Sequence, residues 1–411
     1  MGVLFGYTKG VLKDLLHHAP LPYILVLDIG SGSVGVSIAE VDREEKKPLI
    51  LYTYRALLRV TTKKSQDEFI RTLKEALLEA TLDFSSNGMR LLTEHDQSAR
   101  IDTIHVVYAS PWSELVARHI HVEKDSPVRA TEDLIQTIIG AAEKQATVAS
   151  HEKIIFESSG LAVIHKDVVD AKLNGYPVHE FTGQKCVNIE VTLLSELVPQ
   201  VVRDAMRESE KNLIAHAHVI EHTSAKLLTL SAKRIFDNAE DVLTIEITGE
   251  ATECAVMKHG VVYENFFTLF GMHTFERELA RTLGTIPDEA RSHLKDYAIN
   301  TSHDEVNSAV QLIRTRYKAE LLTLLQSIET KYALPSRVVV LVDPLYREMY
   351  STLIEEIYSS QKPDYKFFVI DDVLLDQFVE YNADIEHDQY AALSTLFFHT
   401  TNTVYAEKAA A

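Results

Sequence analysis

Cysteine, basic charge and long apolar runs are all scarce in this sequence. Its 411 residues include two cysteines, Cys186 and Cys254, too far apart to form a metal-ligand pair, which favours a reduced, cytoplasmic compartment. Lysine and arginine number 41 against 60 aspartates and glutamates, a formal net charge of −19. Because phosphate neutralisation dominates nucleic-acid affinity, this balance argues against a nucleic-acid partner.

No apolar run reaches the roughly 18 residues that suggest a membrane span. The N-terminal extension, residues 1–20, lacks the basic leader and sustained apolar centre of a signal peptide. Its leucines and valines predict a short amphipathic helix that ends at Pro20. Two interpretations stay open: a tail packed on the protein body or frayed, and a helix that contacts a membrane surface or a partner.

A small-residue turn connects two apolar strands near the N-terminus. Asp28 ends the first strand, and Gly30, Ser31, Gly32 and Ser33 form the turn. Small residues allow backbone N–H groups to approach an anion closely, so the turn has the chemistry of a phosphate site. The alternative is a conformational remnant, in which glycine supplies a positive φ and Asp28 caps the turn.

Hydrophobic periodicity predicts a mixed α/β chain. Residues 22–62 read as three strands, 65–83 as a helix, 85–100 as a polar surface excursion and 103–109 as a buried strand. Residues 110–205 form a β-rich block with helices of its own, including one predicted at 196–208. The later elements are expected as a strand at 214–220, helices at 224–236, 271–283, 303–332, 346–359 and 390–398, and strands at 337–342 and 367–370.

The strand–turn–strand pattern occurs twice, at residues 24–40 and 242–256. Two such units are what an actin-like ATPase fold requires, since each of its two similar lobes offers one tight turn to the phosphates. The opening VLDIGSGSVGVSIAEV resembles the first phosphate loop of the family that contains the bacterial cell-division protein FtsA and the type IV pilus assembly protein PilM. At a coarse level the resemblance covers nearly the whole chain.

The resemblance implies an α/β, actin-like (ribonuclease H-like) two-lobe fold with an inserted SHS2-type α+β domain. NGYPVHEFTGQKCVNIEVTLLSE looks like the strand–turn–strand of that insert, and EHDQYAALSTLFF is similar to the family's final helix. The implied domains are a first lobe at 21–109 and 206–238, an inserted domain at 110–205, a second lobe at 239–384 and a C-terminal helix at 385–404 that packs on the first lobe.

The family's nucleotide-contacting positions can be carried over residue by residue. Asp28 would hold Mg²⁺ through water, and Glu221 falls where a carboxylate can face the attacking water. The implied ATP-contacting set is Asp28, Gly30, Ser31, Gly32 and Ser33 in the first loop, Glu246, Gly249 and Thr252 in the second, Gly271 at a helix start and Lys295 in SHLKDY.

Three of the four implied nucleotide-contacting segments depart from the family's pattern. The second loop reads EITGEATECAVM, with Glu250 where the γ-phosphate would lie. The adenosine-side turn is Val342-Asp343-Pro344, and proline has no N–H to offer. Met272 replaces a glycine. These departures predict a pseudo-ATPase that has lost ATP and Mg²⁺, although a chain that still binds them stays open.

The resemblance implies a cytoplasmic scaffold at the membrane-facing side of a bacterial machine, with protein partners. Residues 172–192 favour the cell-division role, whereas an end without a linker and amphipathic helix favours the PilM-like pilus role, so both stay open. A working Mg–ATP ATPase and a filament-forming homo-oligomer are the alternatives of other classes. His216 and His218 alternate on a predicted strand as metal ligands can, with His222 nearby, but chance is the better explanation among 18 histidines.

Overall fold

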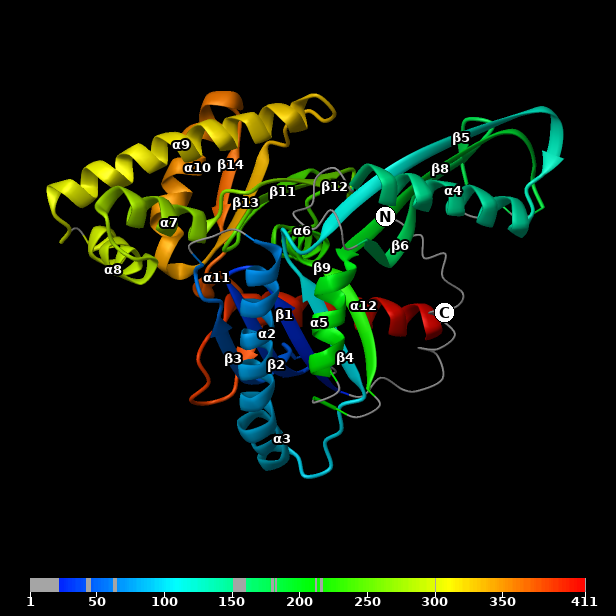
Figure 1. Cartoon of the computed structure of the whole chain (residues 1–411). Coiled ribbons are helices and arrows are strands. Elements are labelled where there is room, and N and C mark those ends of the chain that lie inside the picture. Colours follow the sequence, from blue (N-terminus) through cyan, green and yellow to red (C-terminus); the bar gives the residue numbers. More distant parts are fainter. Residues whose placement is uncertain are drawn as a thin grey trace.

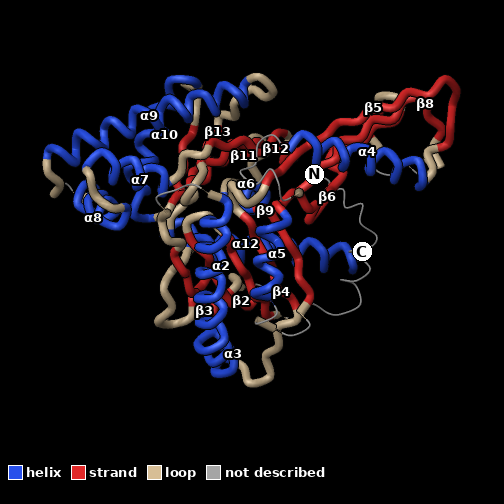
Figure 2. The backbone as a smooth tube through the Cα atoms, viewed as in Figure 1, coloured by secondary structure: helices blue, strands red, loops and turns tan. Residues whose placement is uncertain are grey.

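The computed structural model of this chain describes residues 22–410, apart from 42–45, 62–64, 151–159, 179–180, 182, 211–212, 215–216 and 300. The predicted N-terminal helix, the first part of the strand pair expected from residue 153, and His216 lie outside the described residues. Three sheets organise the described chain (Figures 1 and 2).

The first lobe is built on a six-stranded sheet in the order β15-β3-β2-β1-β4-β9. The hairpin of β1 and β2 is antiparallel, and β1 pairs in parallel with β4. Its strands are β1 (Tyr23–Ile29), β2 (Ser33–Glu40), β3 (Leu49–Leu57), β4 (Thr103–Tyr108), β9 (His218–Thr223) and β15 (Glu380–Tyr381). The chain therefore returns to this sheet at β15, before residue 385.

The second lobe repeats this pattern in a five-stranded sheet, β12-β11-β10-β13-β14. Here β10 is antiparallel to β11 and parallel to β13, as β1 is to β2 and β4. The two-lobe α/β prediction is thus confirmed. The strands are β10 (Val242–Ile247), β11 (Thr252–Lys258), β12 (Val261–Thr268), β13 (Arg337–Val342) and β14 (Lys366–Val369), of which β12 was not predicted.

The block between β4 and β9 forms its own four-stranded sheet, β5-β8-β6-β7, with α4 (Glu132–Ser150) packed on it. Figure 1 shows its long strands extending away from both lobes. They are β5 (Glu114–Arg129), β6 (Leu161–Leu173), β7 (Tyr176–Pro177) and β8 (Lys185–Pro199). A separate apolar cluster fills this block, so it has a core of its own, as an inserted domain requires.

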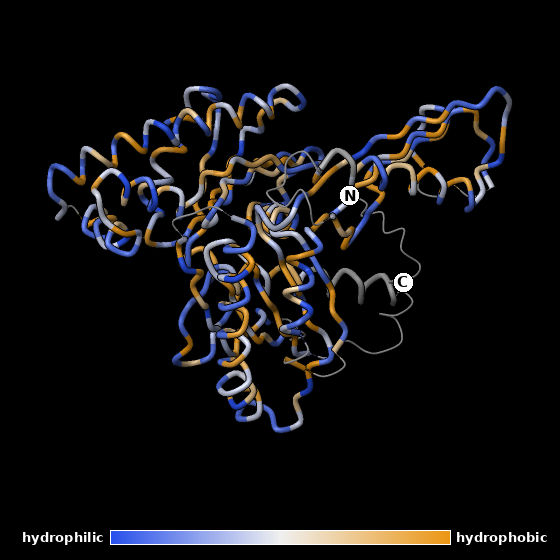
Figure 3. The backbone as a smooth tube through the Cα atoms, in the orientation of Figure 1, coloured by the Kyte–Doolittle hydropathy of each residue, from blue (hydrophilic) through white to orange (hydrophobic). Residues whose placement is uncertain are grey.

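Helices cover both faces of the first sheet. Along β1, Leu25 and Leu27 enter the core on one face, while Ile24 and Val26 enter the core on the other, the period-two pattern of a buried strand. Figure 3 shows hydrophobic stretches along these central strands. The covering helices are α2 (Gln66–Asp83), α3 (Met89–His95) and α5 (Gln200–Glu210) on one side, and α6 (Ser224–Ile235) and α12 (Gln389–Ala410) on the other.

The helices of the second lobe enclose a core with many buried aromatic rings. They are α7 (Met272–Leu283), α8 (Pro287–Ala298), α9 (Asp304–Glu329), α10 (Arg347–Gln361) and the short α11 (Asp372–Leu375), with a 3₁₀ turn at Pro344–Tyr346. The sequence did not single out α8, which begins at Pro287. Among the described residues, none of the helices is both long and apolar enough to cross a membrane.

Two predicted segments were wrong. The polar stretch 85–100 is mostly helical, because α2 continues through a π-helix, Phe84–Gly88, into α3. The Ser85 and Ser86 hydroxyls donate to Thr81 O and Leu82 O one turn earlier. The helix expected from Glu196 begins only at Gln200, because β8 continues to Pro199. Proline lacks the N–H needed to continue the strand ladder, and it suits a helix start.

Candidate functional site

The two small-residue turns face each other across the lobes and touch. The Ser31 hydroxyl donates to Thr248 Oγ1 at 2.9 Å, and the backbone N–H of Glu250 donates to Ser31 Oγ at 2.9 Å. A Cβ added to Gly249 would lie 2.5 Å from the Ser31 carbonyl oxygen, and one added to Gly32 would lie 3.2 Å from Gly249. Protein atoms therefore fill the space between the two turns.

Close approach, and not a positive φ, is what requires glycine at the tip of the first turn. Neither Gly30 nor Gly32 has a positive φ, so the turn geometry expected of a conformational remnant was wrong. The turn is closed by the Gly30 N–H, which donates to Ser33 O at 2.9 Å.

Asp28 is held by an arginine that the sequence did not reveal. Arg55 Nη1, from β3, lies 2.8 Å from Asp28 Oδ2 and 2.9 Å from Ser33 Oγ. The same guanidinium group binds Asp388 at the start of α12, with Nε 2.7 Å from Oδ2 and Nη2 3.0 Å from Oδ1. Burial raises the pKa of Asp28 while Arg55 opposes the rise; for Asp388, Arg55 outweighs burial and lowers the pKa.

Glu246 holds the matching position on β10 and is almost completely buried, at 2% exposure. Its carboxyl group accepts a hydrogen bond from the Ser224 hydroxyl at 2.6 Å. Burial, reinforced by the charge of Glu253 across the strand pair, raises the pKa of Glu246 to about 8. The raised pKa favours the neutral carboxyl group, a poor state for binding a cation.

Glu250 does not line the cavity between the lobes, because its side chain pairs with α7. Its carboxylate pairs with Arg277, with Nη1 at 2.8 Å from Oε1, and with His273, both from α7. Burial would raise the pKa of Glu250, but the hydrogen bonds from His273 and Arg277 outweigh it and lower the pKa to about 2. The charge of the Glu250 carboxylate is thus neutralised by an internal ion pair, which also links the second turn to α7.

A cavity of about 250 Å³ remains beside these groups, between the lobes. Small-ligand pockets usually span about 300–1,000 Å³, so this one is small for a nucleotide. The predicted site residues that line it are Asp28, Gly30, Gly32, Ser33, Glu246, Gly249 and Lys295. The bulk that narrows it comes from Arg55, Leu57, Met272, Leu345, Tyr346 and Tyr390.

Four predicted site residues do not line the cavity. Ser31 joins the two turns, as described above, and the Thr252 hydroxyl donates to Phe270 O at 2.8 Å inside the second-lobe core. Gly271 is the N-cap of α7, where a Cβ would lie 2.4 Å from Thr248 O. Glu221, expected to face an attacking water, instead accepts from Arg203 Nε at 2.9 Å and from the Tyr108 hydroxyl at 3.0 Å.

These residues do not fit a magnesium–nucleotide complex. A Mg²⁺ ion beside Asp28 would lie next to the Arg55 guanidinium group, and two like charges at such a distance repel. The second turn touches the first and lines the cavity. The Val342-Asp343-Pro344 turn leads into a 3₁₀ segment whose Leu345 and Tyr346 also line the cavity. Arg55, Asp388 and Tyr390 were missed because Arg55 carries no motif and lies 333 residues from Asp388, and the likeness of residues 386–398 to a final helix gave no sign that they face the site.

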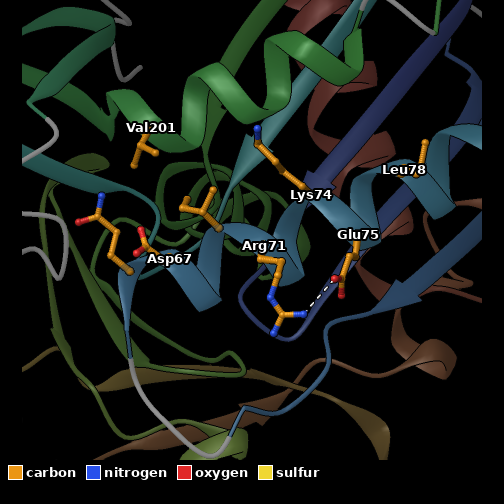
Figure 4. Close-up of a pocket in the computed structure, with 8 residues that line it drawn as sticks. Asp67, Arg71, Lys74, Glu75, Leu78 and Val201 are labelled. Carbon is orange, nitrogen blue, oxygen red and sulfur yellow. Dashed lines mark hydrogen bonds and ion pairs between the residues drawn. The ribbon is translucent and has the colours of Figure 1, made fainter.

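A second hollow lies on the surface between α2 and α5 (Figure 4). It measures about 440 Å³ and lies where the inserted block rejoins the first lobe. Apolar side chains on its wall alternate with charged ones, and Arg71 pairs with Glu75 along α2 at 3.2 Å. The residues of this α2–α5 groove are Gln66, Asp67, Ile70, Arg71, Lys74, Glu75, Leu78 and Val201.

One group of side chains in the described chain has metal-ligand spacing: His165, Asp167 and Glu196. The Lys226 ammonium group already lies among them, 2.7 Å from Asp167 and 2.8 Å from Glu196. The positive charge among these three side chains is therefore supplied by a lysine. Of the alternating histidines, His222 packs beside the Phe398 ring, with centroids 5.2 Å apart.

Comparison with solved structures identifies the fold. A chain of the PilM–PilN type IV pilus biogenesis complex superposes with a TM-score of 0.57 at 13% identity, covering 92% of this chain and 98% of that one. The ethanolamine utilization protein EutJ from Carboxydothermus hydrogenoformans gives 0.43 at 12% identity, covering 94% of both chains. A Bacteroides thetaiotaomicron protein with an actin-like ATPase fold and unknown function gives 0.39 at 10% identity, covering 95% of this chain and 99% of that one.

No protein-family model matches the sequence, and no curated protein matches it. The chain has the two-lobe actin-like ATPase fold, and the PilM structure shares that fold over nearly its full length. At 13% identity this likeness establishes the fold alone.

Proposed function

We propose that this chain is a PilM-like scaffold, which binds a protein partner and does not turn over nucleotide. The contact between the two turns carries the proposal: Ser31 and Thr248 are hydrogen-bonded at 2.9 Å where a nucleotide's phosphates would have to enter. Arg55 on Asp28 and the small cavity support the same conclusion. We prefer the pilus role to the cell-division role because a chain of a pilus biogenesis complex shares the fold over nearly its full length.

The α2–α5 groove is the proposed docking site for the partner. It lies between α2 and α5 on one face of the first lobe, next to the point where the inserted block rejoins that lobe. Ile70 and Leu78 offer apolar contacts, and Leu78 is 54% exposed. The alternating charges of Asp67, Arg71 and Lys74 would pair with a segment that carries both signs. By analogy with the PilM–PilN complex, the partner is the cytoplasmic segment of a pilus protein in the position of PilN.

Fluorescence anisotropy with a labelled peptide tests this docking site. The probe is the N-terminal cytoplasmic peptide of the PilN-like protein from the same organism, titrated with the full chain. Ile70→Asp should weaken binding at least about tenfold, since a carboxylate would enter an apolar contact. The matched control is Leu82→Asp, on the same helix at 61% exposure and outside the groove. Equal affinities for both variants, or no binding by the wild type, would contradict the proposal.

A further inference from the structure

Arg55 reaches Asp28 by passing over a glycine on the strand between them. Asp28 on β1 pairs with Gly35 on β2, and Gly35 pairs with Arg55 on β3, so the three residues form one row across the sheet. A Cβ on Gly35 would lie 2.5 Å from Arg55 Nη2. The missing side chain at position 35 therefore leaves the space that the guanidinium group occupies.

The other edge of the same guanidinium group fixes the start of α12. Asp388 receives two bonds from Arg55, at 2.7 and 3.0 Å, and its Oδ1 also accepts from the backbone N–H groups of Tyr390 and Ala391, at 2.9 and 3.1 Å. The Tyr390 ring stacks on the guanidinium group at 4.5 Å. A paired, fork-shaped contact of this kind is stronger and more directional than a single ion pair.

The next residue of α12 continues this chain of contacts into the second lobe. Gln389 Nε2 donates to Val342 O, at the end of β13, at 2.8 Å, and Arg347 Nη2 donates to Gln389 Oε1 at 3.0 Å. A continuous polar path thus runs from β1 through Arg55 and the start of α12 to β13 and α10. It crosses between the lobes next to the cavity.

We propose that the Arg55 guanidinium group takes the place of the Mg²⁺ ion that the family resemblance implies beside Asp28. Its permanent charge neutralises Asp28 and, through Asp388 and Gln389, holds the second lobe against the first. Magnesium would do this only with a bound nucleotide and its own shell of oxygen ligands. The arginine clasp, defined as Asp28, Arg55, Asp388 and Gln389, therefore keeps the lobes closed with no ligand. The clasp goes beyond the proposed function, because it concerns how the two lobes are held together and does not depend on a partner binding in the α2–α5 groove.

Hydrogen–deuterium exchange on the full chain tests the clasp. Arg55→Met keeps most of the side-chain volume and removes the charge. We expect amide exchange in residues 24–34 and 388–399 to become at least about tenfold faster, because two buried carboxylates lose their partner and the segments open more often. The matched control is Arg90→Met on α3, whose arginine pairs with Glu94 at the surface and whose loss should leave both segments unchanged. The proposal would be overturned if amide exchange in residues 24–34 and 388–399 were the same in Arg55→Met as in Arg90→Met.

A second comparison covers the case in which Arg55→Met does not fold. Arg55→Lys keeps the charge but cannot make the two-bond contact with Asp388. We therefore expect slow amide exchange to persist in residues 24–34 and exchange to become faster in residues 388–399. With wild-type protein, millimolar Mg²⁺–ATP should leave exchange in both segments unchanged; slower exchange would show that the lobes need a ligand to close, and would overturn the clasp. Peptide affinity is a separate readout, so the docking proposal can fail while the clasp stands.

Discussion

At the scale of single residues, buried carboxyl groups set the charge between the lobes. Glu246 and Glu253 lie opposite each other on β10 and β11, at 2% and 1% exposure. Burial raises the pKa of both; the charge of Glu253 adds to the rise for Glu246, and the charge of Glu114 adds to the rise for Glu253. The Ser224 hydroxyl donates to Glu246, and the Ser110 hydroxyl donates to one oxygen of Glu253. This pair therefore stabilises the closed lobes best when it carries protons.

Glu246→Gln should make stability less sensitive to rising pH. The pKa of Glu246 is raised from 4.5 to about 8, so the folded state binds its proton more tightly than the unfolded state does. The free energy of unfolding must then fall as pH rises through that window, by up to about 1.4 kcal/mol per pH unit. Glutamine has no proton to lose. Urea unfolding between pH 4.5 and about 8 should show the free energy of unfolding of Glu246→Gln rising relative to wild type as pH rises. A difference between the two proteins that does not change with pH would contradict the raised pKa of Glu246. Glu75→Gln, at the surface of α2, is the control.

At the scale of elements, the strand row through Gly35 couples β1, β2 and β3. Gly35→Ala should destabilise the protein by about 1–3 kcal/mol, the usual cost of forcing atoms into a packed site. The loss should shrink in the Gly35→Ala/Arg55→Met double variant, because the new methyl group then meets a flexible, uncharged chain. The control is Gly140→Ala in α4, where nothing lies within 4 Å of the added Cβ and alanine favours the helix. Additive losses in a double-mutant cycle would contradict the coupling.

The elements that the sequence predicts well are those whose own residues determine them. β1 and β10 are buried on both faces and carry dense apolar runs, and α2 begins at the Ser65 cap, so their positions follow from local pattern. The start of α5 could not be predicted in this way. Glu196 looks like a helix residue, but it is fully buried in β8 because Lys226, on α6, pairs with it.

The candidate site is predictable only in part, for the same reason. The first turn can be found because glycine and serine cluster between apolar strands, and the second because its strand–turn–strand pattern repeats the first. The direction of the acidic side chains near the site depends on partners from other elements. Arg277 on α7 pairs with Glu250 of the second turn, and Arg203 on α5 pairs with Glu221 of β9. Arg55 and Asp388 are 333 residues apart, and only the folded chain shows that they are partners.

At the scale of the whole molecule, the closed lobes determine how the protein responds to nucleotide. A ligand that binds only the folded state adds about 2.7 kcal/mol of stability at a hundredfold excess over its Kd. For a domain of a few hundred residues, that amount raises Tm by several degrees. A working Mg–ATP site of micromolar affinity should therefore give a plain shift at millimolar ATP. The proposed scaffold, with its turns in contact and Arg55 on Asp28, should give none.

Differential scanning calorimetry with and without Mg²⁺–ATP, on wild type and Asp28→Ala, measures this response. We expect the wild-type Tm to stay constant with nucleotide. Asp28→Ala should lower Tm in both conditions, because it removes one of the two carboxylates paired with Arg55 and breaks the ion pair to β1. A nucleotide-dependent rise in wild type that disappears in Asp28→Ala would identify a functional ATP site and refute the pseudo-ATPase. A constant Tm in wild type, together with the lower Tm of Asp28→Ala, would make Asp28 a structural anchor of the closed lobes.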